Sequence, residues 1–145
     1  MGRNRDIQKQ IDEIIKPFLD KDKKTVKRDF LKMQDETRPE EIRAISNFMS
    51  EHYKNITSTQ LRNLFNELKK VESKNNLLLK KAKLAYITGR TNKDKIGMLA
   101  FLHLLDLFID KVFEDAEIQI EGLITFLEAS LSYHKYYEKL NPKSK

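Results

Sequence analysis

The hydrophobic positions of this chain recur every three or four residues along most of its length. Such spacing places apolar side chains on one face of an α-helix. The pattern predicts a succession of helices and no strands. The predicted helices differ in how strongly the pattern supports them, and the first 36 residues carry the weakest pattern.

Residues 1–36 are predicted to form one or two charged helices, which could lie at the periphery of the molecule. Their first apolar stripe is Ile7, Ile11, Ile14, Ile15 and Phe18. Pro17 lacks a backbone donor and crowds the preceding turn, so it should kink or shorten the first helix. The polar run DKDKK at 20–24 predicts a break, and a weaker stripe follows at Val26, Phe30 and Met33.

A second helix is predicted from the capping-box spacing of Thr37 and Glu40, with Pro39 in the first turn. It should run to about Tyr53. Its expected core-facing residues are Ile42, Ile45, Phe48 and Met49.

Thr57 and Gln60 form another capping box, flanked by Ile56 and Leu61 at the positions of a hydrophobic staple. The helix that starts there should extend to Val71. Its apolar face is Leu61, Leu64, Phe65, Leu68 and Val71. Arg62 and Lys69 lie about 100° or more from the centre of that face, so they should point sideways or outward.

A basic segment, KKAKLAYITGR at 80–90, follows a predicted break at 73–76. The helix here should run from Leu77 to about Thr88, with Gly89 as a left-handed residue that ends it. Arg90 would then sit just past a helix C-terminus, where positive charge is favourable.

Two lysines of this segment face different directions. Lys81 falls inside the apolar arc of the helix, so either its stem packs while its ammonium group reaches water, or the arc faces an anionic group. Lys83 is about 200° from Lys81 around the helix axis. The two lysines therefore cannot touch one nucleic-acid strand from one flat face.

From about Asn92, a helix of about twenty residues is apolar almost all round, which predicts a central position or a subunit contact. Residues 114–117, EDAE, form either a turn or a continuation of that helix. A last helix is predicted from about Ile118 to Leu140, and 141–145 should be a frayed basic tail.

Composition supports an all-α fold: the 145 residues include only four Gly and three Pro, and 34% are charged. We expect a single domain, 1–145, folded as a compact bundle of about five to six helices. With no cysteine, the chain can form neither a disulfide nor a thiolate zinc site, and it suits a reducing cytosol. No segment has the length of a membrane span, so we expect a cytoplasmic protein without a membrane partner.

Charge is unevenly distributed along the chain. Residues 54–90 hold nine Lys or Arg against two Glu, a net charge of +7, whereas 96–134 hold one Lys against seven acids, a net charge of −6. This polarity suits an anionic partner on one side and a protein contact on the other. The alternative is an ordinary solvated surface with segregated charges.

The chain shows no convincing catalytic or metal-binding motif. His103, Asp106 and Asp110 share a helix face, but neither Glu-x-x-His nor His-Glu-x-x-His occurs. These side chains could instead pair with each other or with a neighbouring helix. The four scattered glycines cannot build a phosphate-cradling loop. We therefore predict no metal, no cofactor and no enzymatic activity.

Nucleic-acid binding has more support. The candidate phosphate contacts are Arg62, Lys69, Lys80, Lys81, Lys83 and Arg90. Tyr86, or the cluster Tyr133, Tyr136 and Tyr137 beside Lys135, could stack on bases. The alternatives are a solvated face for the lysines, and a core edge or subunit contact for the tyrosines.

Three segments together resemble the small subunit of the type III-A CRISPR effector, the Csm complex. They are ITSTQLRNLFNEL at 56–68, LKKAKLAYITGR at 79–90 and FLEASLSYHKYY at 126–137. The resemblance implies a helical bundle without catalytic activity, several copies of which stack beside the backbone subunits and face the duplex of guide and target RNA. Residues 1–50 show no such likeness.

The resemblance also implies roles for single residues. Arg62, Lys81, Lys83 and Arg90 fall on basic positions that contact RNA backbone. Further matches to the family pattern are Tyr86, Gly89, Tyr133, Lys135, Tyr136 and Tyr137, whereas Lys80 and Ile87 stand at variable positions. We therefore expect RNA-binding residues Arg62, Lys69, Lys81, Lys83, Arg90 and Lys135, and as partners RNA, other Csm subunits and further copies of this chain. The alternative function is a purely structural protein-protein interaction module without RNA contact.

Overall fold

The computed structural model describes residues 2–33 and 38–141, and side chains from residue 6 onward. Within these ranges the chain forms six α-helices and three short 3-10 turns. The α-helices are α1 (Gly2–Ile15), α2 (Pro39–His52), α3 (Ser58–Lys69), α4 (Lys74–Arg90), α5 (Ile96–Glu114) and α6 (Ile120–Leu140). The all-α bundle predicted from the hydrophobic pattern is confirmed. No helix in the described ranges is both long and apolar enough to span a membrane.

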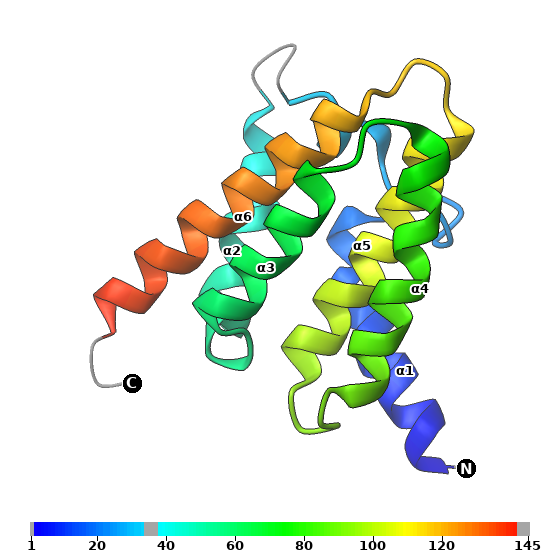
Figure 1. Cartoon of the computed structure of the whole chain (residues 1–145). Coiled ribbons are helices and arrows are strands. Elements are labelled where there is room, and N and C mark those ends of the chain that lie inside the picture. The colour runs from blue at the N-terminus through cyan, green and yellow to red at the C-terminus, as the bar shows by residue number, and fades with distance from the viewer. Residues whose placement is uncertain (1, 34–37, 142–145) are drawn as a thin grey trace.

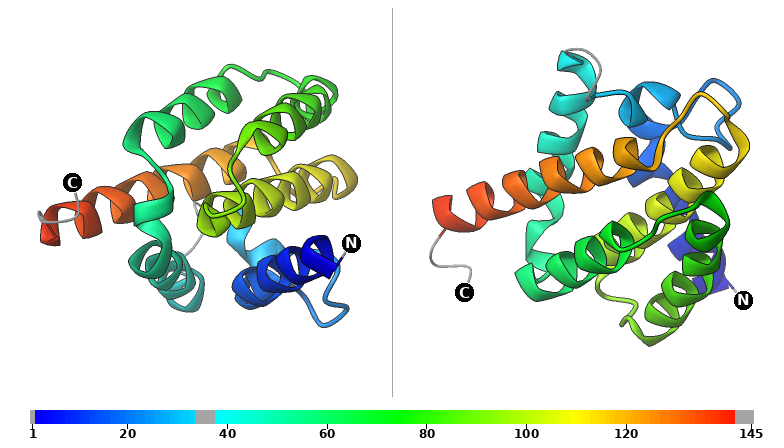
Figure 2. Two further views of the ribbon diagram at one scale, coloured as in Figure 1. Left: turned by 90° about the horizontal axis from the view of Figure 1, so that it is seen from below. Right: turned by 45° about the horizontal axis from the view of Figure 1, so that its top comes forward.

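The helices lie in three layers of two, which are clearest in the left view of Figure 2. The middle layer consists of α5 and α6. Helices α4 and α1 pack on opposite sides of α5, and α3 and α2 pack on opposite sides of α6. As a result, α3 and α4 lie side by side and form one outer face of the molecule (Figure 1).

Helix α5 is the centre of the core, as its all-round apolar sequence predicted. Eleven of its residues are buried, from Gly97 to Val112. It begins at Ile96 rather than near Asn92, because residues 92–95 form a turn in which the Lys95 amide donates to the Asn92 carbonyl over 3.0 Å. The acidic run after α5 is a turn, since α5 ends at Glu114 and α6 begins at Ile120.

The N-terminal segment belongs to the core, which corrects the expected peripheral position. Phe18 and Phe30 are almost fully buried, and their rings contact each other at 4.8 Å between centroids. Both rings also meet Phe126 of α6 at 6.3–6.4 Å. The aromatic cluster therefore holds the segment against the middle layer.

Of the one or two helices expected in this segment, only one α-helix, α1, forms in the described residues. Between the two phenylalanines, the DKDKK break makes a tight turn closed by a bridge between Leu19 and Val26. Only a 3-10 turn follows, at Arg28–Leu31. Long-range packing of a few apolar side chains determines this irregular path of the chain. The spacing of apolar residues in the sequence therefore could not predict it.

The two predicted capping boxes have different outcomes. At α3, the Thr57 side chain accepts from the Gln60 amide over 3.0 Å, and the Gln60 side chain accepts from the Thr57 amide over 2.9 Å, so that box is confirmed. At α2, Arg38 is the N-cap residue and makes no side-chain cap. Thr37 lies outside the described residues.

Helix α2 buries Ile45, Phe48 and Met49 as expected, and it ends at His52 beside the predicted Tyr53. Ile42, which was also expected to face the core, is 37% exposed. The predicted frayed tail falls on Asn141, which is the exposed residue after α6, and on 142–145, which lie outside the described residues.

Two glycines allow close approach between elements. A Cβ atom added to Gly122 of α6 would lie 2.1 Å from the carbonyl oxygen of Leu31, and one added to Gly97 of α5 would lie 2.7 Å from the Cβ of His52. The Gly97 amide also donates to the side chain of Asn55 over 2.8 Å. Any larger residue at these positions would push the layers apart.

Candidate nucleic-acid interface

Helix α4 carries the basic segment and is longer at both ends than the sequence predicted. It starts at Lys74 because Ser73 caps it, with the Ser73 hydroxyl accepting from the Asn76 amide over 3.1 Å. The expected break at 73–76 is therefore wrong, and the connection to α3 lies just before Ser73. The Lys74 ammonium also donates to the Asp115 carbonyl over 2.9 Å, which ties this end of α4 to the end of α5.

Gly89 does not end the helix, which corrects the left-handed conformation expected for it. No described glycine has a positive φ, and α4 continues through Gly89 to Arg90. The hydroxyls of Thr88 and Thr91 donate to the carbonyls of Leu84 and Ile87 over 2.8 and 2.7 Å. The Thr91 amide also donates to the Thr88 carbonyl over 3.1 Å, so Thr91 satisfies two of the last carbonyls of α4 without a left-handed cap. Arg90 is the last helical residue.

Lys81 faces helix α5 and pairs with carboxylates of that helix. Its Nζ donates to Asp110 of α5 over 2.5 Å, and it lies 3.7 Å from Asp106. The hydrogen bond to Asp110 raises the pKa of Lys81 above its ordinary value. The anionic group that the apolar arc of α4 faces is thus supplied by the chain itself.

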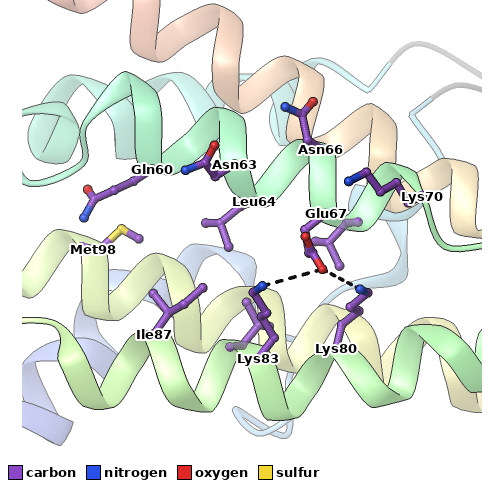
Figure 3. A pocket seen from close by; sticks show the side chains of 12 residues that line it. Gln60, Asn63, Leu64, Asn66, Glu67, Lys70, Lys80, Lys83, Ile87 and Met98 are labelled. Carbon is purple, nitrogen blue, oxygen red and sulfur yellow. Dashed lines mark hydrogen bonds and ion pairs between the residues drawn. The ribbon is translucent and has the colours of Figure 1, made fainter.

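Lys80 and Lys83 share one carboxylate of α3. The Glu67 Oε1 atom accepts from Lys80 Nζ over 2.7 Å and lies 3.8 Å from Lys83 Nζ (Figure 3). The hydrogen bond from Lys80 lowers the pKa of Glu67. Lys83 keeps 54% of its side chain exposed, so its ammonium remains available to a second anion.

Arg90 is paired with the aromatic ring one turn earlier. Its guanidinium donates to the hydroxyl of Tyr86 over 2.9 Å and lies 5.6 Å from the centre of that ring. Tyr86 itself is 62% exposed. Neither contact neutralises the charge of Arg90, so the pair presents a positive group and a flat ring together.

The remaining predicted cations are exposed on α3 and α6. Arg62, Lys69 and Lys135 form no ion pair with any residue that the structure describes, and Lys69 only lies over the ring of Phe65 at 5.4 Å. The sideways or outward direction predicted for Arg62 and Lys69 is confirmed, because both residues are exposed.

Helices α3 and α4 therefore carry most of the predicted cations. Lys83 and Arg90 lie within about 20° of each other around α4 and about 10.5 Å apart along its axis. Arg62 and Lys69, also seven residues apart, have the same relation on α3. We call these four residues the α3/α4 cation set. Lys81 lies on the opposite side of α4 and does not belong to it.

A groove of about 470 Å³ separates the two helices. It exists because α3 packs on α6 while α4 packs on α5, and the ion pairs of Glu67 with Lys80 and Lys83 join the two helices across it. Polar side chains of both helices line its rim, including Asn63, Glu67, Lys70 and Lys83 (Figure 3). The sequence pattern gave no sign of this groove, because it depends on the spacing between two helices.

A family model described as Csm2 Type III-A matches residues 36–140 of the chain. The match covers α2 to α6 and contains all three segments on which the sequence resemblance rests. The chain belongs to the Csm2 Type III-A family. It is a small subunit of a type III-A CRISPR complex. No curated protein and no solved structure matches the chain.

The terminal signature of this Csm2-family chain has a structural centre that the sequence did not reveal. His134 is buried, and its Nε2–H donates to the carbonyls of Ile56 at 2.5 Å and Tyr53 at 3.2 Å. It thereby ties α6 to the start of α3. The hydroxyl of Tyr137 pairs with Ser46 of α2 at 2.7 Å, whereas Tyr136 and Lys135 remain exposed.

The acids once considered for a metal site serve a different purpose. Asp106 and Asp110 face Lys81, and His103 is partly buried beside them on α5. The described residues contain no group of three or more His, Cys, Asp or Glu side chains placed to hold a metal ion.

Proposed function

We propose that this Csm2-family subunit binds the backbone of RNA through the outer face of α3 and α4, without reading sequence. The RNA partner would be the duplex of guide and target RNA in the Csm complex, which acts in antiviral defence in the cytoplasm. The observation that carries the proposal is the α3/α4 cation set, because its four members lie on the two neighbouring helices of one outer layer and only Lys83 among them forms an ion pair with a described carboxylate, at 3.8 Å from Glu67.

The distribution of acids supports the same face. Asp106 and Asp110 are directed at Lys81, on the side of α4 opposite Lys83, so Lys81 offsets part of their negative charge. Glu67 lies below Lys80 and Lys83 and compensates part of their charge. Phosphates would therefore meet Arg62, Lys69, Lys83 and Arg90 first.

Two other residues that were predicted to bind RNA, Lys135 and Lys81, lie outside the α3/α4 cation set. Lys135 is an exposed residue of α6, which belongs to the middle layer. It would therefore extend the RNA contact beyond α3. Lys81 is left out of the contact set, because binding a phosphate would require it to give up Asp110. We assign it to holding α4 on α5.

We further propose that the subunit is non-catalytic and contacts other Csm subunits and copies of itself. Its family of structural small subunits supports the first point. The end of α6 supports the second, since Tyr136 and Leu140 are more than half exposed there. Such apolar side chains at a helix end suit a protein contact.

A second candidate function is a purely structural module without RNA contact. The feature in its favour is Leu79, which is 72% exposed on the outer side of α4, one turn before Lys83. An apolar side chain in that position would also suit a protein partner on the α3 and α4 face.

Titration of the purified chain with two single-stranded RNAs of unrelated sequence, in rising salt, separates the two candidates. Backbone binding through Z phosphates predicts equal affinities and a log-log slope of about −0.7Z for both RNAs. A structural module predicts no saturable binding to either RNA. A strong preference for one sequence would contradict binding through phosphates alone.

A further inference from the structure

The groove between α3 and α4 has features that backbone binding does not use. Its floor is formed by buried apolar side chains, namely Leu64, Leu68, Leu84 and Met98. Its volume of about 470 Å³ falls within the range of small-molecule sites. A phosphate gains nothing from an apolar floor, so the floor suits a different part of the ligand.

The carboxylate of Glu67 also argues against a phosphate inside the groove. It lies between the two helices and faces Lys80 and Lys83 (Figure 3). A phosphate entering the groove would be repelled by Glu67 and would have to displace it from Lys80. An uncharged group with hydrogen-bonding edges meets no such barrier.

The rim offers both donors and acceptors to such a group. Asn63 makes no side-chain hydrogen bond with a described residue, and its amide can both donate and accept. Gln60 uses its Oε1 atom in the α3 cap, which leaves its NH₂ group as a donor. Glu67 has a second oxygen, Oε2, that accepts no hydrogen bond from the described residues.

Positive charge flanks the groove on both helices. Lys70 and Lys83 line its rim, and Lys83 belongs to the α3/α4 cation set. An occupant with a neutral planar part and flanking anionic groups would therefore match both the interior and the rim.

We propose that this groove receives one nucleobase of the bound RNA that is unpaired and turned out of the duplex, while the flanking phosphates contact Lys83 and Lys70. The inference rests on the proposed function and adds a base-binding site to it. The apolar floor would contact the flat ring of the base. Asn63 and Glu67 would form hydrogen bonds with the polar atoms at its edge. The side chains on the rim can meet several base edges, so the site favours unpaired RNA rather than one sequence.

The test compares two RNAs of equal length, one normal and one in which abasic sites replace the bases. Binding to the wild-type chain is measured for both over a range of salt concentrations. The groove predicts roughly tenfold or more tighter binding of the normal RNA, as expected for one well-held base, with the same salt slope for both RNAs. This arm needs no variant, so it does not depend on a substitution that could disturb folding.

Two tryptophan variants locate the effect. Asn63 and Asn75 are both exposed helical asparagines, but only Asn63 lines the groove. Asn63→Trp should fill the groove and abolish the difference between the two RNAs, whereas Asn75→Trp should preserve it. A thermal melt of each variant shows whether it remains folded.

Every other outcome contradicts either the groove inference alone or the proposed function as well. If neither RNA binds, both this inference and the proposed function are wrong. If both RNAs bind equally with a normal salt slope, only the groove inference is wrong. If the difference survives in Asn63→Trp and disappears in Tyr86→Ala, the base stacks on Tyr86 instead. If Asn63→Trp impairs only assembly with other Csm subunits, the groove holds a protein segment.

Discussion

The ammonium group of Lys81 donates to the carboxylate of Asp110 over 2.5 Å, across the contact between α4 and α5. In the sequence, Lys81 is one of three lysines in the most basic segment of the chain, and Asp110 belongs to the acidic half. Their pairing joins the two halves that the charge distribution separated. It also divides the basic segment into lysines that hold the fold and lysines that face outward.

Replacing Lys81 should therefore affect stability more than RNA binding. Lys81→Met removes a partly exposed ion pair and leaves Asp106 and Asp110 as like charges one turn apart, so we expect a loss of about 1 kcal/mol in the free energy of unfolding. Urea denaturation measures this loss. A double-mutant cycle with Asp110→Asn should give a favourable coupling energy, and no coupling would contradict the pairing.

Substitutions of Lys81 and Lys83 should also differ in their effect on RNA binding. Lys83→Met should make the salt slope shallower by about 0.7, because one phosphate contact is lost. Lys81→Met should leave the slope unchanged. Equal effects of the two variants would mean that both lysines reach RNA.

Two glycine substitutions should have opposite effects on stability. Gly122→Ala places a Cβ atom against the Leu31 carbonyl, so we expect a loss of roughly 2 kcal/mol or more and a melting temperature lower by about 5 °C. Gly89→Ala should instead stabilise the chain by about 0.5–1 kcal/mol, because Gly89 is helical and a Cβ atom there meets open space.

Differential scanning calorimetry of both variants checks this pair. A destabilised Gly89→Ala would indicate a left-handed Gly89, as the sequence suggested, and would place the end of α4 about two residues earlier.

Glu67 should contribute a pH-dependent part of the stability. Because Lys80 lowers the pKa of Glu67 below its ordinary 4.5 in the folded state, the carboxylate stabilises the fold fully above that value. The contribution is lost as the pH falls through the lowered pKa and the carboxylate is protonated.

The free-energy difference between the wild type and Glu67→Gln should therefore be present at neutral pH and shrink below about pH 4.5. Urea denaturation at a series of pH values measures it. Glu72→Gln serves as the control, since Glu72 is exposed and forms no ion pair with a described residue. A difference that is the same at neutral and acidic pH would show that Glu67 acts through packing alone.

His134 should be a structural residue despite its place in a family signature. His134→Leu removes the donor to the carbonyls of Ile56 and Tyr53, and we expect a loss of about 1–3 kcal/mol in the free energy of unfolding. Tyr136→Phe, on the exposed side of α6, should cost almost nothing. If His134→Leu remained as stable as the wild type and lost RNA binding, the histidine would belong to the interface instead.

The sequence predicted the elements whose signals are local. The Thr57 and Gln60 box marked the start of α3, and the all-round apolar pattern of α5 placed it in the centre. The segment around Phe18 and Phe30 was misplaced, because rings distant in sequence hold it. Gly89 was misassigned because Thr91 satisfies the last carbonyls of α4 without a left-handed glycine.

The candidate site was predictable only in part. Helical geometry showed that Lys81 and Lys83 face different directions and placed Lys81 in the apolar arc of the helix, but it left open whether the Lys81 ammonium group meets water or an anionic group. That answer depends on the docking of α4 onto α5, which places Asp110 under Lys81. The groove and the role of Glu67 depend in the same way on the spacing between α3 and α4. The hydrophobic pattern of one helix gives no information about that spacing.

The most direct test of RNA binding by the α3 and α4 face uses two charge-matched variants of the chain, each assembled into the Csm complex. One carries Arg62→Ala, Lys69→Ala, Lys83→Ala and Arg90→Ala. The other carries Lys16→Ala, Lys21→Ala, Lys24→Ala and Lys27→Ala, at exposed positions outside α3 and α4. Target RNA affinity is measured over a range of salt concentrations. We predict weaker binding and a shallower salt slope for the first variant only; unchanged binding, or equal loss in both, would contradict the account.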